Sequence, residues 1–241
     1  MNLKVGIDYL LYLLSVPKCV GCNEKLDFGE KAFCPKCSAD FEEIKTRNCS
    51  KCAKVLSECS CTTHFLSTHF IKGVFKCYRY DVRDENRPAN ALIYSLKRDN
   101  RDDVLQKCTD ELCKAIQNSI TPDESFIITN VPRRRKAVIE YGIDHSALLA
   151  KSLAKRFNIQ YLNLLESKTK REQKTLNFEE RLKNIEFELL SNASLKGKNV
   201  IIVDDIITTG ASLSVASSLI RSLGPKNIYG ASLAIAYKDD M

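Results

Sequence analysis

The sequence lacks the two commonest nucleotide-binding signatures. No Gly-x-x-x-x-Gly-Lys-Ser/Thr element occurs, which excludes a P-loop. No Gly-x-Gly-x-x-Gly element follows an apolar run, which excludes the dinucleotide fingerprint of Rossmann domains. A phosphate group, if this chain binds one, must therefore be held by a different loop.

Long apolar runs, repeats and low-complexity linkers are also absent. The apolar stretch Tyr9–Leu14 is too short to span a bilayer. Asp8 precedes it, and Pro17-Lys18 stands where a signal peptide needs small residues for cleavage. We therefore expect a cytoplasmic protein without membrane insertion, whose residues 1–16 form one helix that packs against the rest of the chain.

Length and composition favour a folded domain with a small additional module. The chain has 241 residues, of which 44% are hydrophobic, which is typical of globular rather than disordered proteins. One medium domain and one small metal module fit this length. The formal net charge of +7 is compatible with nucleic acid binding, but many cytosolic proteins share such a charge.

Cysteine is unevenly distributed. Of the 11 cysteines, eight lie between Cys19 and Cys61, and they form four closely spaced pairs. These pairs are Cys19 with Cys22, Cys34 with Cys37, Cys49 with Cys52, and Cys59 with Cys61. Each short turn presents two sulfurs to one ion, so the pairs predict two structural Zn²⁺ sites. The simplest partition joins the first two pairs in one site and the last two in the other.

Other interpretations of these cysteines remain open at this stage. Interleaved pairing is compatible with the spacing, and His64 and His69 are potential substitute ligands. A disulfide framework would need a secreted context, which the sequence does not indicate. The segment is too short to bury much core, so metal binding must supply its folding energy, on the order of 10 kcal/mol per zinc. The remaining cysteines have no metal spacing and are expected to fill apolar space: Cys77, Cys108 and Cys113.

Downstream of the cysteines, strands alternate with helices, which predicts a parallel α/β sheet. Strands are expected at Phe70–Tyr80 (alternatively a hairpin), Ser125–Thr129, Ile159–Leu165, Val200–Val203 and Ile228–Ala236. Helices are expected at Pro88–Lys97, Asp102–Ile116, Ile143–Phe157 and Ser212–Leu223. Ligands of such sheets bind at the carboxyl ends of the strands.

The most informative stretch is Val200–Ser212. Four apolar residues predict a buried strand, and Asp204 and Asp205 follow where it is expected to end. A loop of small residues, three of them with hydroxyls, then leads into a helix: Thr208, Thr209, Gly210, Ala211 and Ser212. Hydroxyls and free N–H groups at a helix start can hold a phosphate, and the carboxylates can accept sugar hydroxyls directly or around Mg²⁺. A plain acidic turn, the alternative, would not need this loop.

Two further segments carry charge near the same predicted edge. Arg133, Arg134, Arg135 and Lys136 follow the strand at 125–129, and they suit a pyrophosphate or a nucleic acid backbone. A solvated basic loop is the competing interpretation. Tyr78 and Tyr80 are candidates for stacking on bases, although tyrosines at strand spacing are more often core. The long polar stretch Lys168–Arg181 is either an active-site lid or a partly helical, mobile segment.

Val200–Ser212 resembles the signature of type I phosphoribosyltransferases, which bind phosphoribosyl pyrophosphate (PRPP). With the paired cysteines, the chain from Cys19 to Tyr237 is similar to the ComF competence family, called amidophosphoribosyltransferase-like. Three groups of residues support the resemblance: Tyr94–Lys97, Asn130–Pro132, and the set Arg171, Gln173, Arg181 and Asn184. The family's Arg-Gly-Phe-Asn-Gln element is here Tyr141–His145, with Tyr, Asp and His in place of Arg, Asn and Gln.

The resemblance implies a type I phosphoribosyltransferase fold behind an N-terminal double zinc ribbon. The expected organisation is a helix over 1–16, the double ribbon over 17–68 and a phosphoribosyltransferase-like domain over 69–241. Asp204 and Asp205 would hold the ribose hydroxyls, Thr208–Ser212 the 5′-phosphate, and Mg²⁺ would accompany the pyrophosphate. The implied role is natural transformation and DNA uptake, with single-stranded DNA and other DNA-processing proteins as partners. The alternative is an active phosphoribosyltransferase that acts on a base or amine in nucleotide metabolism.

Overall fold

A computed structural model of the chain describes residues 16–81, 88–99, 101–168 and 185–236. Its centre is a five-stranded sheet in the order β1-β7-β6-β2-β3, in which every neighbouring pair is parallel. The strands are β1 (Ile71–Arg79), β2 (Phe126–Asn130), β3 (Gln160–Tyr161), β6 (Asn199–Ile207) and β7 (Asn227–Ile235). The predicted parallel α/β sheet is therefore confirmed.

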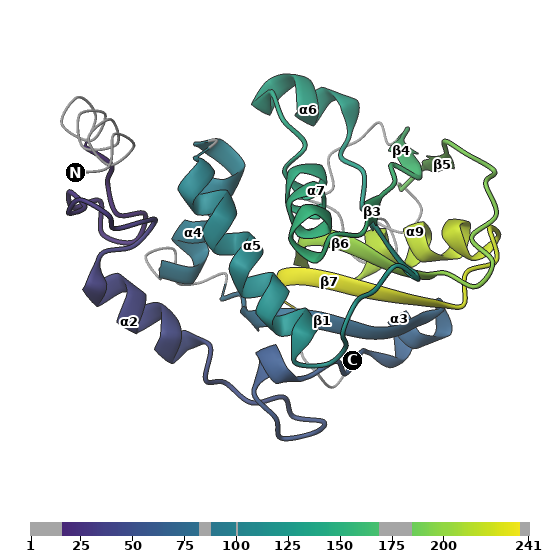
Figure 1. Cartoon of the computed structure of the whole chain (residues 1–241), viewed down its shortest axis with the longest axis horizontal. Helices are drawn as coiled ribbons and strands as arrows, with labels where there is room; N and C mark the ends of the chain where they lie inside the picture. Colours follow the sequence, from purple (N-terminus) through teal and green to yellow (C-terminus); the bar gives the residue numbers. More distant parts are fainter. Residues whose placement is uncertain (1–15, 82–87, 100, 169–184, 237–241) are drawn as a thin grey trace.

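Helices cover both faces of this sheet (Figure 1). One face carries α5 (Asp102–Gln117) and α7 (His145–Phe157), and α4 (Pro88–Arg98) packs on α5. The other face carries α9 (Ala211–Arg221), and α3 (His64–Thr68) lies against β1. The remaining helices of the described residues are α2 (Pro35–Ile44), η1 (Leu56–Glu58) and α6 (Arg135–Tyr141).

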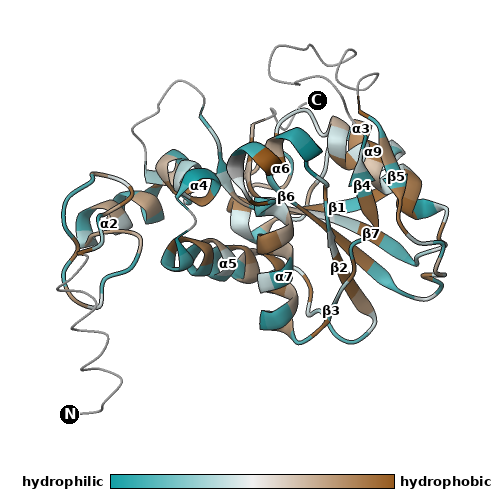
Figure 2. Cartoon of the chain, turned by 90° about the horizontal axis from the view of Figure 1, so that it is seen from above, coloured by the Kyte–Doolittle hydropathy of each residue, from teal (hydrophilic) through white to brown (hydrophobic). Residues whose placement is uncertain are grey.

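The central strand β6 shows why the sheet is buried on both faces. Ile201 and Val203 belong to the core under α5 and α7, whereas Val200 and Ile202 belong to the core under α9. Successive strand residues point to opposite faces, so a continuous apolar run is what a doubly covered sheet requires. Figure 2 shows the corresponding hydrophobic colour along the strands and much hydrophilic colour on α5.

The N-terminal cysteine-rich segment packs onto the α4–α5 side of the molecule. Phe41 of α2 is fully buried, and its ring meets Tyr78 of β1 edge-on at 5.6 Å. Beside it, the buried carboxylate of Glu111 on α5 accepts Lys45 Nζ at 2.6 Å and Lys107 Nζ at 2.8 Å. These two lysines lower the pKa of Glu111 against the opposing effect of burial. Apolar packing and a paired buried charge thus join α2 to α5.

Three elements differ from the sequence prediction. The strand expected at Ile159–Leu165 is split: β3 pairs with β2, whereas β4 (Leu165–Ser167) pairs antiparallel with β5 (Phe187–Leu189) in a separate ribbon. The strand expected at Val200–Val203 continues as β6 to Ile207, because β7 goes on pairing with it. The basic segment expected as a loop becomes helical from Arg135 onward, as α6.

Several predicted features fall outside the described residues. These are the helix over 1–16, apart from Val16, most of the stretch Lys168–Arg181, and the family-like residues Arg171, Gln173, Arg181 and Asn184. Within the described ranges, none of the helices has the length and apolar character needed to cross a membrane.

Candidate functional site

A cavity of about 480 Å³ opens at the carboxyl ends of β6 and β2. Its lining comes from segments far apart in sequence: the end of α4, the loop after β2, the start of α7 and the segment from β6 into α9. The predicted site residues that line it are Arg133, Arg134, Asp204, Asp205, Thr208, Thr209, Gly210, Ala211 and Ser212. The structure thus gathers the predicted acidic pair, the predicted loop and two of the three predicted arginines around one space. Open α/β sheets bind their ligands at this place, outside the carboxyl ends of the strands.

The two aspartates sit at a step in the sheet rather than beyond the end of a strand. β6 pairs with β2 only as far as Val203, but it stays paired with β7 through Ile207. Asp204 and Asp205 therefore lie on a strand supported from one side and open on the other. This one-sided support fixes their backbone while leaving room for a ligand beside them.

Asp205 is the better buried of the pair, with 7% of its surface exposed. Its Oδ2 accepts Arg133 NH2 at 2.7 Å and Lys97 Nζ at 3.0 Å. Burial alone would raise the pKa of Asp205, but the two cations beside it outweigh burial and lower the pKa. Asp205 is therefore a carboxylate at neutral pH, and it holds two positive groups at the cavity wall.

Asp204 has a different environment. Its Oδ1 accepts the Asp205 backbone N–H at 2.9 Å and lies 3.4 Å from Ser146 Oγ. Burial, and then the negative charge of Asp205, raise the pKa of Asp204 to about 7. Two adjacent carboxylates with pKa values pushed apart are typical of functional sites. Asp204 is the member that changes its charge near physiological pH.

The raised pKa of Asp204 predicts a stability difference that depends on pH. The pKa of Asp204 is about 7 in the folded protein and lower in the unfolded chain, so the protonated side chain stabilises the fold. This contribution is complete at pH values below the unfolded pKa, and it is lost as the pH rises through about 7. Asn mimics the protonated acid at every pH. We expect Asp204→Asn to match the wild-type free energy of unfolding near pH 4 and to exceed it by a few kcal/mol near pH 8.

Urea unfolding of both proteins across that range checks this prediction. Asp110→Asn, which removes a surface carboxylate paired with Arg156, is the matched control and should show no such divergence. A difference between Asp204→Asn and wild type that does not change with pH would show that Asp204 titrates normally.

The Thr208–Ser212 loop, which follows the two aspartates in the chain, also lines the cavity. Gly210 precedes α9 with φ +79°, a left-handed conformation that glycine adopts at little cost. Thr209 Oγ1 accepts the Ala211 N–H at 3.3 Å. The loop thus brings hydroxyls and the first turn of a helix to one wall of the cavity, where the N-terminal helix dipole favours an anion.

The departure from the family-like element at 141–145 has a structural explanation. Asp144 Oδ1 caps α7 by accepting the Ala147 N–H at 3.0 Å, and Oδ2 accepts the Arg133 backbone N–H at 3.3 Å. His145 is 2% exposed, and its Nδ1 has no partner within the described residues. Burial, and then Arg133, lower its pKa, so the imidazole is neutral at pH 7. Asp144 therefore helps to position Arg133 in the loop after β2. His145 is buried and is not a surface residue.

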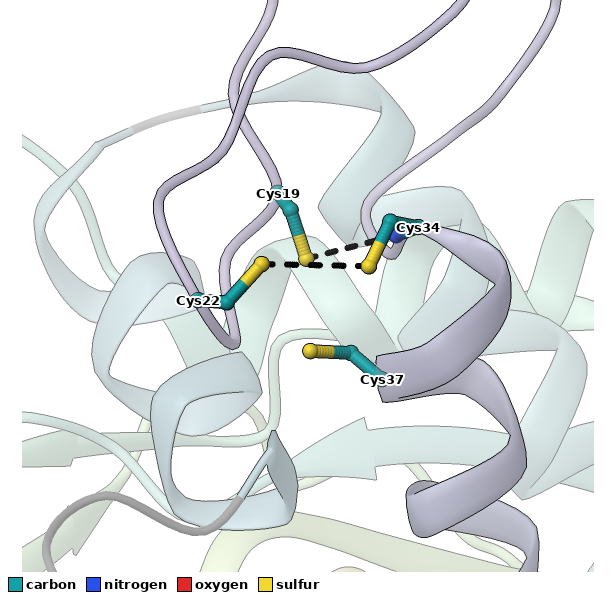
Figure 3. A group of neighbouring side chains, drawn as sticks. All are labelled: Cys19, Cys22, Cys34 and Cys37. Atoms are coloured by element: carbon teal, nitrogen blue, oxygen red, sulfur yellow. Dashed lines mark hydrogen bonds between the residues drawn. The ribbon is translucent and has the colours of Figure 1, made fainter.

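The first four cysteines, Cys19, Cys22, Cys34 and Cys37, form one cluster (Figure 3). Their sulfurs lie within 4.8 Å of one another and point towards a common centre. Cys22 Sγ and Cys34 Sγ are 3.8 Å apart. A tetrahedral zinc with bonds of about 2.3 Å places its ligands about 3.8 Å apart, whereas a disulfide needs about 2.05 Å. The cluster therefore fits zinc.

The last four cysteines, Cys49, Cys52, Cys59 and Cys61, form the second cluster, so the simplest partition is confirmed over interleaved pairing. Neither His64 nor His69 belongs to a cluster. The three remaining cysteines, Cys77, Cys108 and Cys113, are buried within the apolar core, as predicted for fillers.

Lys76 of β1 gives the second cluster a feature that the sequence did not reveal. It is 1% exposed, and its Nζ lies 2.8 Å from Cys61 O and 3.4 Å from Cys59 Sγ. Within the described ranges, the partners of its ammonium group are three backbone carbonyls and the Cys59 sulfur, and none is a carboxylate. A buried charge needs compensation. Four thiolates around Zn²⁺ carry a net charge of about −2 and would supply it.

Comparison with known proteins agrees with this architecture. Residues 142–239 match the model of the phosphoribosyl transferase domain family. Competence protein ComFC of Streptococcus pneumoniae (strain R6) is 23% identical over 200 residues, which cover 83% of this chain and 86% of that protein. The chain is therefore similar to ComFC over most of its length, and residues 142–239 match a phosphoribosyltransferase domain. Its sheet and the family match confirm the predicted type I phosphoribosyltransferase fold, and its two cysteine clusters stand where the zinc ribbons were predicted.

Other relatives match shorter segments. Competence protein ComFC of Bacillus subtilis (strain 168) is 29% identical over 107 residues, 44% of this chain and 43% of that protein. A ribose-phosphate pyrophosphokinase of Thermococcus kodakarensis is 55% identical over 38 residues, 16% of this chain and 14% of its own length. The chain thus spans less than half the length of these two relatives. The purine phosphoribosyltransferase structure from Pyrococcus horikoshii has a TM-score of 0.36 at 22% identity, covering 54% of this chain and 72% of that one.

Proposed function

We propose that this protein binds PRPP, or another 5-phosphoribosyl ligand, together with Mg²⁺, and that it binds single-stranded DNA in natural transformation. One observation carries the ligand proposal: the acidic pair Asp204 and Asp205, the Thr208–Ser212 loop and two cations line the same cavity. The acidic pair suits the sugar hydroxyls, the loop suits the 5′-phosphate, and the cations suit the pyrophosphate. The similarity to proteins named for competence supports the DNA part.

The wall of the cavity suggests a role for each group. The Thr208–Ser212 loop would hold the 5′-phosphate, and Asp204 and Asp205 would accept the ribose hydroxyls. Arg133 and Lys97, held at the wall by Asp205, would meet the pyrophosphate. The carboxylate oxygens are hard ligands of the kind that Mg²⁺ prefers, and bound Mg²⁺ would neutralise charge on the pyrophosphate. Because Asp205 fixes both cations before a ligand arrives, little ordering is left for binding.

DNA binding is assigned to basic residues outside the cavity. Arg133 and Arg134 line the cavity, whereas Arg135 and Lys136 of α6 are exposed and do not. Exposed lysines surround the first cysteine cluster: Lys18, Lys25, Lys31 and Lys36. Tyr78 takes no part, because it is fully buried and its hydroxyl donates to Ala89 O at 2.9 Å, so stacking by Tyr78 was a wrong prediction. Tyr80 lines the cavity instead.

The salt dependence of DNA binding tests this assignment. Arg135→Gln with Lys136→Gln is expected to flatten the slope of log affinity against log salt by roughly 0.7 per lost phosphate contact on single strands. PRPP affinity should stay unchanged, since neither side chain lines the cavity. Sequence preference should be small, because phosphate contacts carry no base information. The slope is measured by fluorescence anisotropy with labelled single strands at several salt concentrations.

A matched control makes the same change in charge at the opposite edge of the sheet. Lys155→Gln with Lys226→Gln replaces two exposed lysines, one at the end of α7 and one just before β7. If the control flattens the slope as much as the α6 variant, binding follows net charge and not α6. If neither changes it, the ribbon lysines carry the DNA.

Enzymatic turnover is a second candidate function, favoured by the pairing of Asp204 and Asp205 beside a phosphoribosyltransferase family match. Carboxylates at this position would stabilise positive charge developing on the ribose ring. Pyrophosphate release from PRPP, measured with candidate amines and bases, separates the two functions. Release that Asp204→Asn abolishes supports an enzyme, and salt-sensitive DNA binding without release supports a binding protein.

A further inference from the structure

Helix α3 connects the second cysteine cluster to the wall of the cavity. It begins at His64, soon after the last ligand of the cluster, Cys61. Thr63, which is 5% exposed, caps it by accepting the Leu66 N–H at 3.2 Å. Lys51, inside the cluster's first turn, donates to Thr62 O at 2.9 Å. The start of α3 is therefore set by the chain that holds the cluster together, and α3 lies against β1 (Figure 1).

Leu66 of α3 packs directly onto Gly210 of the loop. It is 1% exposed, and a Cβ added at Gly210 would lie 2.8 Å from Leu66 Cδ2 and 3.1 Å from Cγ. Real Cβ atoms essentially never come this close, so the leucine occupies the space that the missing side chain leaves. Gly210 is thus required both by its φ of +79° and by the leucine above it.

Two more contacts tie α3 to the helix that the loop begins. Ser217 of α9 is fully buried, and its Oγ donates to His69 O, just after α3, at 2.6 Å. Leu66 also shares one apolar core with Leu213 of α9 and with the ligands Cys49 and Cys59. Packed cores transmit displacement because they contain few voids. Movement of the second cluster would therefore reach the loop.

The first cluster makes different contacts. Ala32, beside it, donates its N–H to Asp103 Oδ2 at 2.8 Å, at the start of α5. A Cβ at Gly21 would meet Pro88 of α4 at 3.5 Å. In the part of the chain that the structure describes, these contacts lie on α4 and α5 and not on the Thr208–Ser212 loop. The second cluster also touches the end of α5, where Asn118 Nδ2 donates to Ser57 O at 3.0 Å, but of the two clusters it is the one that α3 connects to the loop.

We propose that the second cysteine cluster is a brace for the Thr208–Ser212 loop, with Leu66 as the positioning residue that holds Gly210. The phosphate-binding role of this loop rests on the proposed function, but the brace is a property of the fold. Zinc at Cys49, Cys52, Cys59 and Cys61 fixes α3, and α3 holds the loop in the form that presents its hydroxyls and N–H groups to the cavity. The first cluster has no such role.

Hydrogen exchange in the zinc-loaded full chain tests the brace without any ligand. Leu66→Ala is expected to speed exchange of amides in the 208–214 segment by roughly tenfold, including the Ser214 N–H, which donates to Gly210 O at 2.8 Å. Leu26→Ala is the matched control, since Leu26 is also fully buried but lies beside the first cluster. Equal exchange of the loop in Leu66→Ala and wild type, or an equal increase in both variants, would overturn the proposal.

A double-mutant cycle between Leu66 and Gly210 keeps the proposal testable if Leu66→Ala folds poorly. Gly210→Ala alone should speed exchange of the loop, because its Cβ meets Leu66. Leu66→Ala added to Gly210→Ala should relieve that collision, so the double variant should exchange more slowly than the product of the two single effects. Leu66→Met, which conserves volume, should behave like wild type. Effects that simply multiply would show that Leu66 does not hold Gly210.

Binding of PRPP to the same variants separates this inference from the proposed function. If wild type binds PRPP, Leu66→Ala should weaken binding by roughly tenfold and Leu26→Ala should leave it unchanged. If wild type does not bind PRPP, the proposed function fails, and the exchange comparison alone decides whether the brace exists.

Discussion

Asp204→Asn with Asp205→Asn is expected to abolish detectable PRPP binding while leaving the fold intact. Each carboxylate that accepts a sugar hydroxyl contributes about 1.5–3 kcal/mol as a charge-assisted hydrogen bond, so losing two predicts a loss of at least about 100-fold. Asn keeps the shape of the side chain but removes its charge. Asp205→Asn also releases Arg133 and Lys97 from the carboxylate that now holds them. Isothermal titration with PRPP measures the loss.

The single variants show which part of the loss is structural. Asp204→Asn should not destabilise the free protein, because it removes a carboxylate with a raised pKa. Asp205→Asn should destabilise it, because two cations at the wall lose their partner. Circular dichroism of both singles and the double variant checks folding, with Asp110→Asn as control. Normal PRPP binding by a folded double variant would mean that the ligand site lies elsewhere.

Two zinc equivalents per chain are expected in protein purified without added metal. Cys49→Ser with Cys52→Ser should leave one equivalent, since it removes half the ligands of the second cluster only. Loss of a structural zinc forfeits on the order of 10 kcal/mol, far more than a segment this short gains from burial. We therefore expect local unfolding around the lost site, visible as protease cleavage in residues 46–69. Elemental analysis measures the metal.

The control replaces a cysteine that is no ligand. Cys113→Ser changes a buried thiol of α5 and should keep both zinc equivalents. Zinc near zero in wild type, with disulfides found by mass spectrometry, would contradict the assignment of both clusters.

The parts of the site that were predictable from sequence are those formed by neighbouring residues. A Cys-x-x-Cys turn presents both sulfurs to one ion wherever it lies in a fold, so the clusters follow from local spacing. The acidic pair and the Thr208–Ser212 loop share one strand-to-helix connection. Their mutual position is therefore already contained in thirteen consecutive residues.

The parts that were not predictable depend on distant contacts. Arg133 and Asp205 are 72 positions apart, and only the sheet order, with β2 beside β6, brings them together. Lys76 is a single polar residue within a predicted strand, and only the fold places its Nζ 3.4 Å from Cys59 Sγ of the second cluster. The strand expected at Ile159–Leu165 divides because its apolar residues serve two sheets, and periodicity does not distinguish between them.

Isothermal titration of PRPP into the zinc-loaded protein, with and without Mg²⁺, tests the central claim most directly. We predict saturable binding of one PRPP per chain, tighter with Mg²⁺, and lost in the variant that carries both Asp204→Asn and Asp205→Asn. The cavity has room for one such ligand beside the acidic pair. Absence of heat from PRPP in wild type at pH 8, under conditions where both zinc ions are retained, would contradict it.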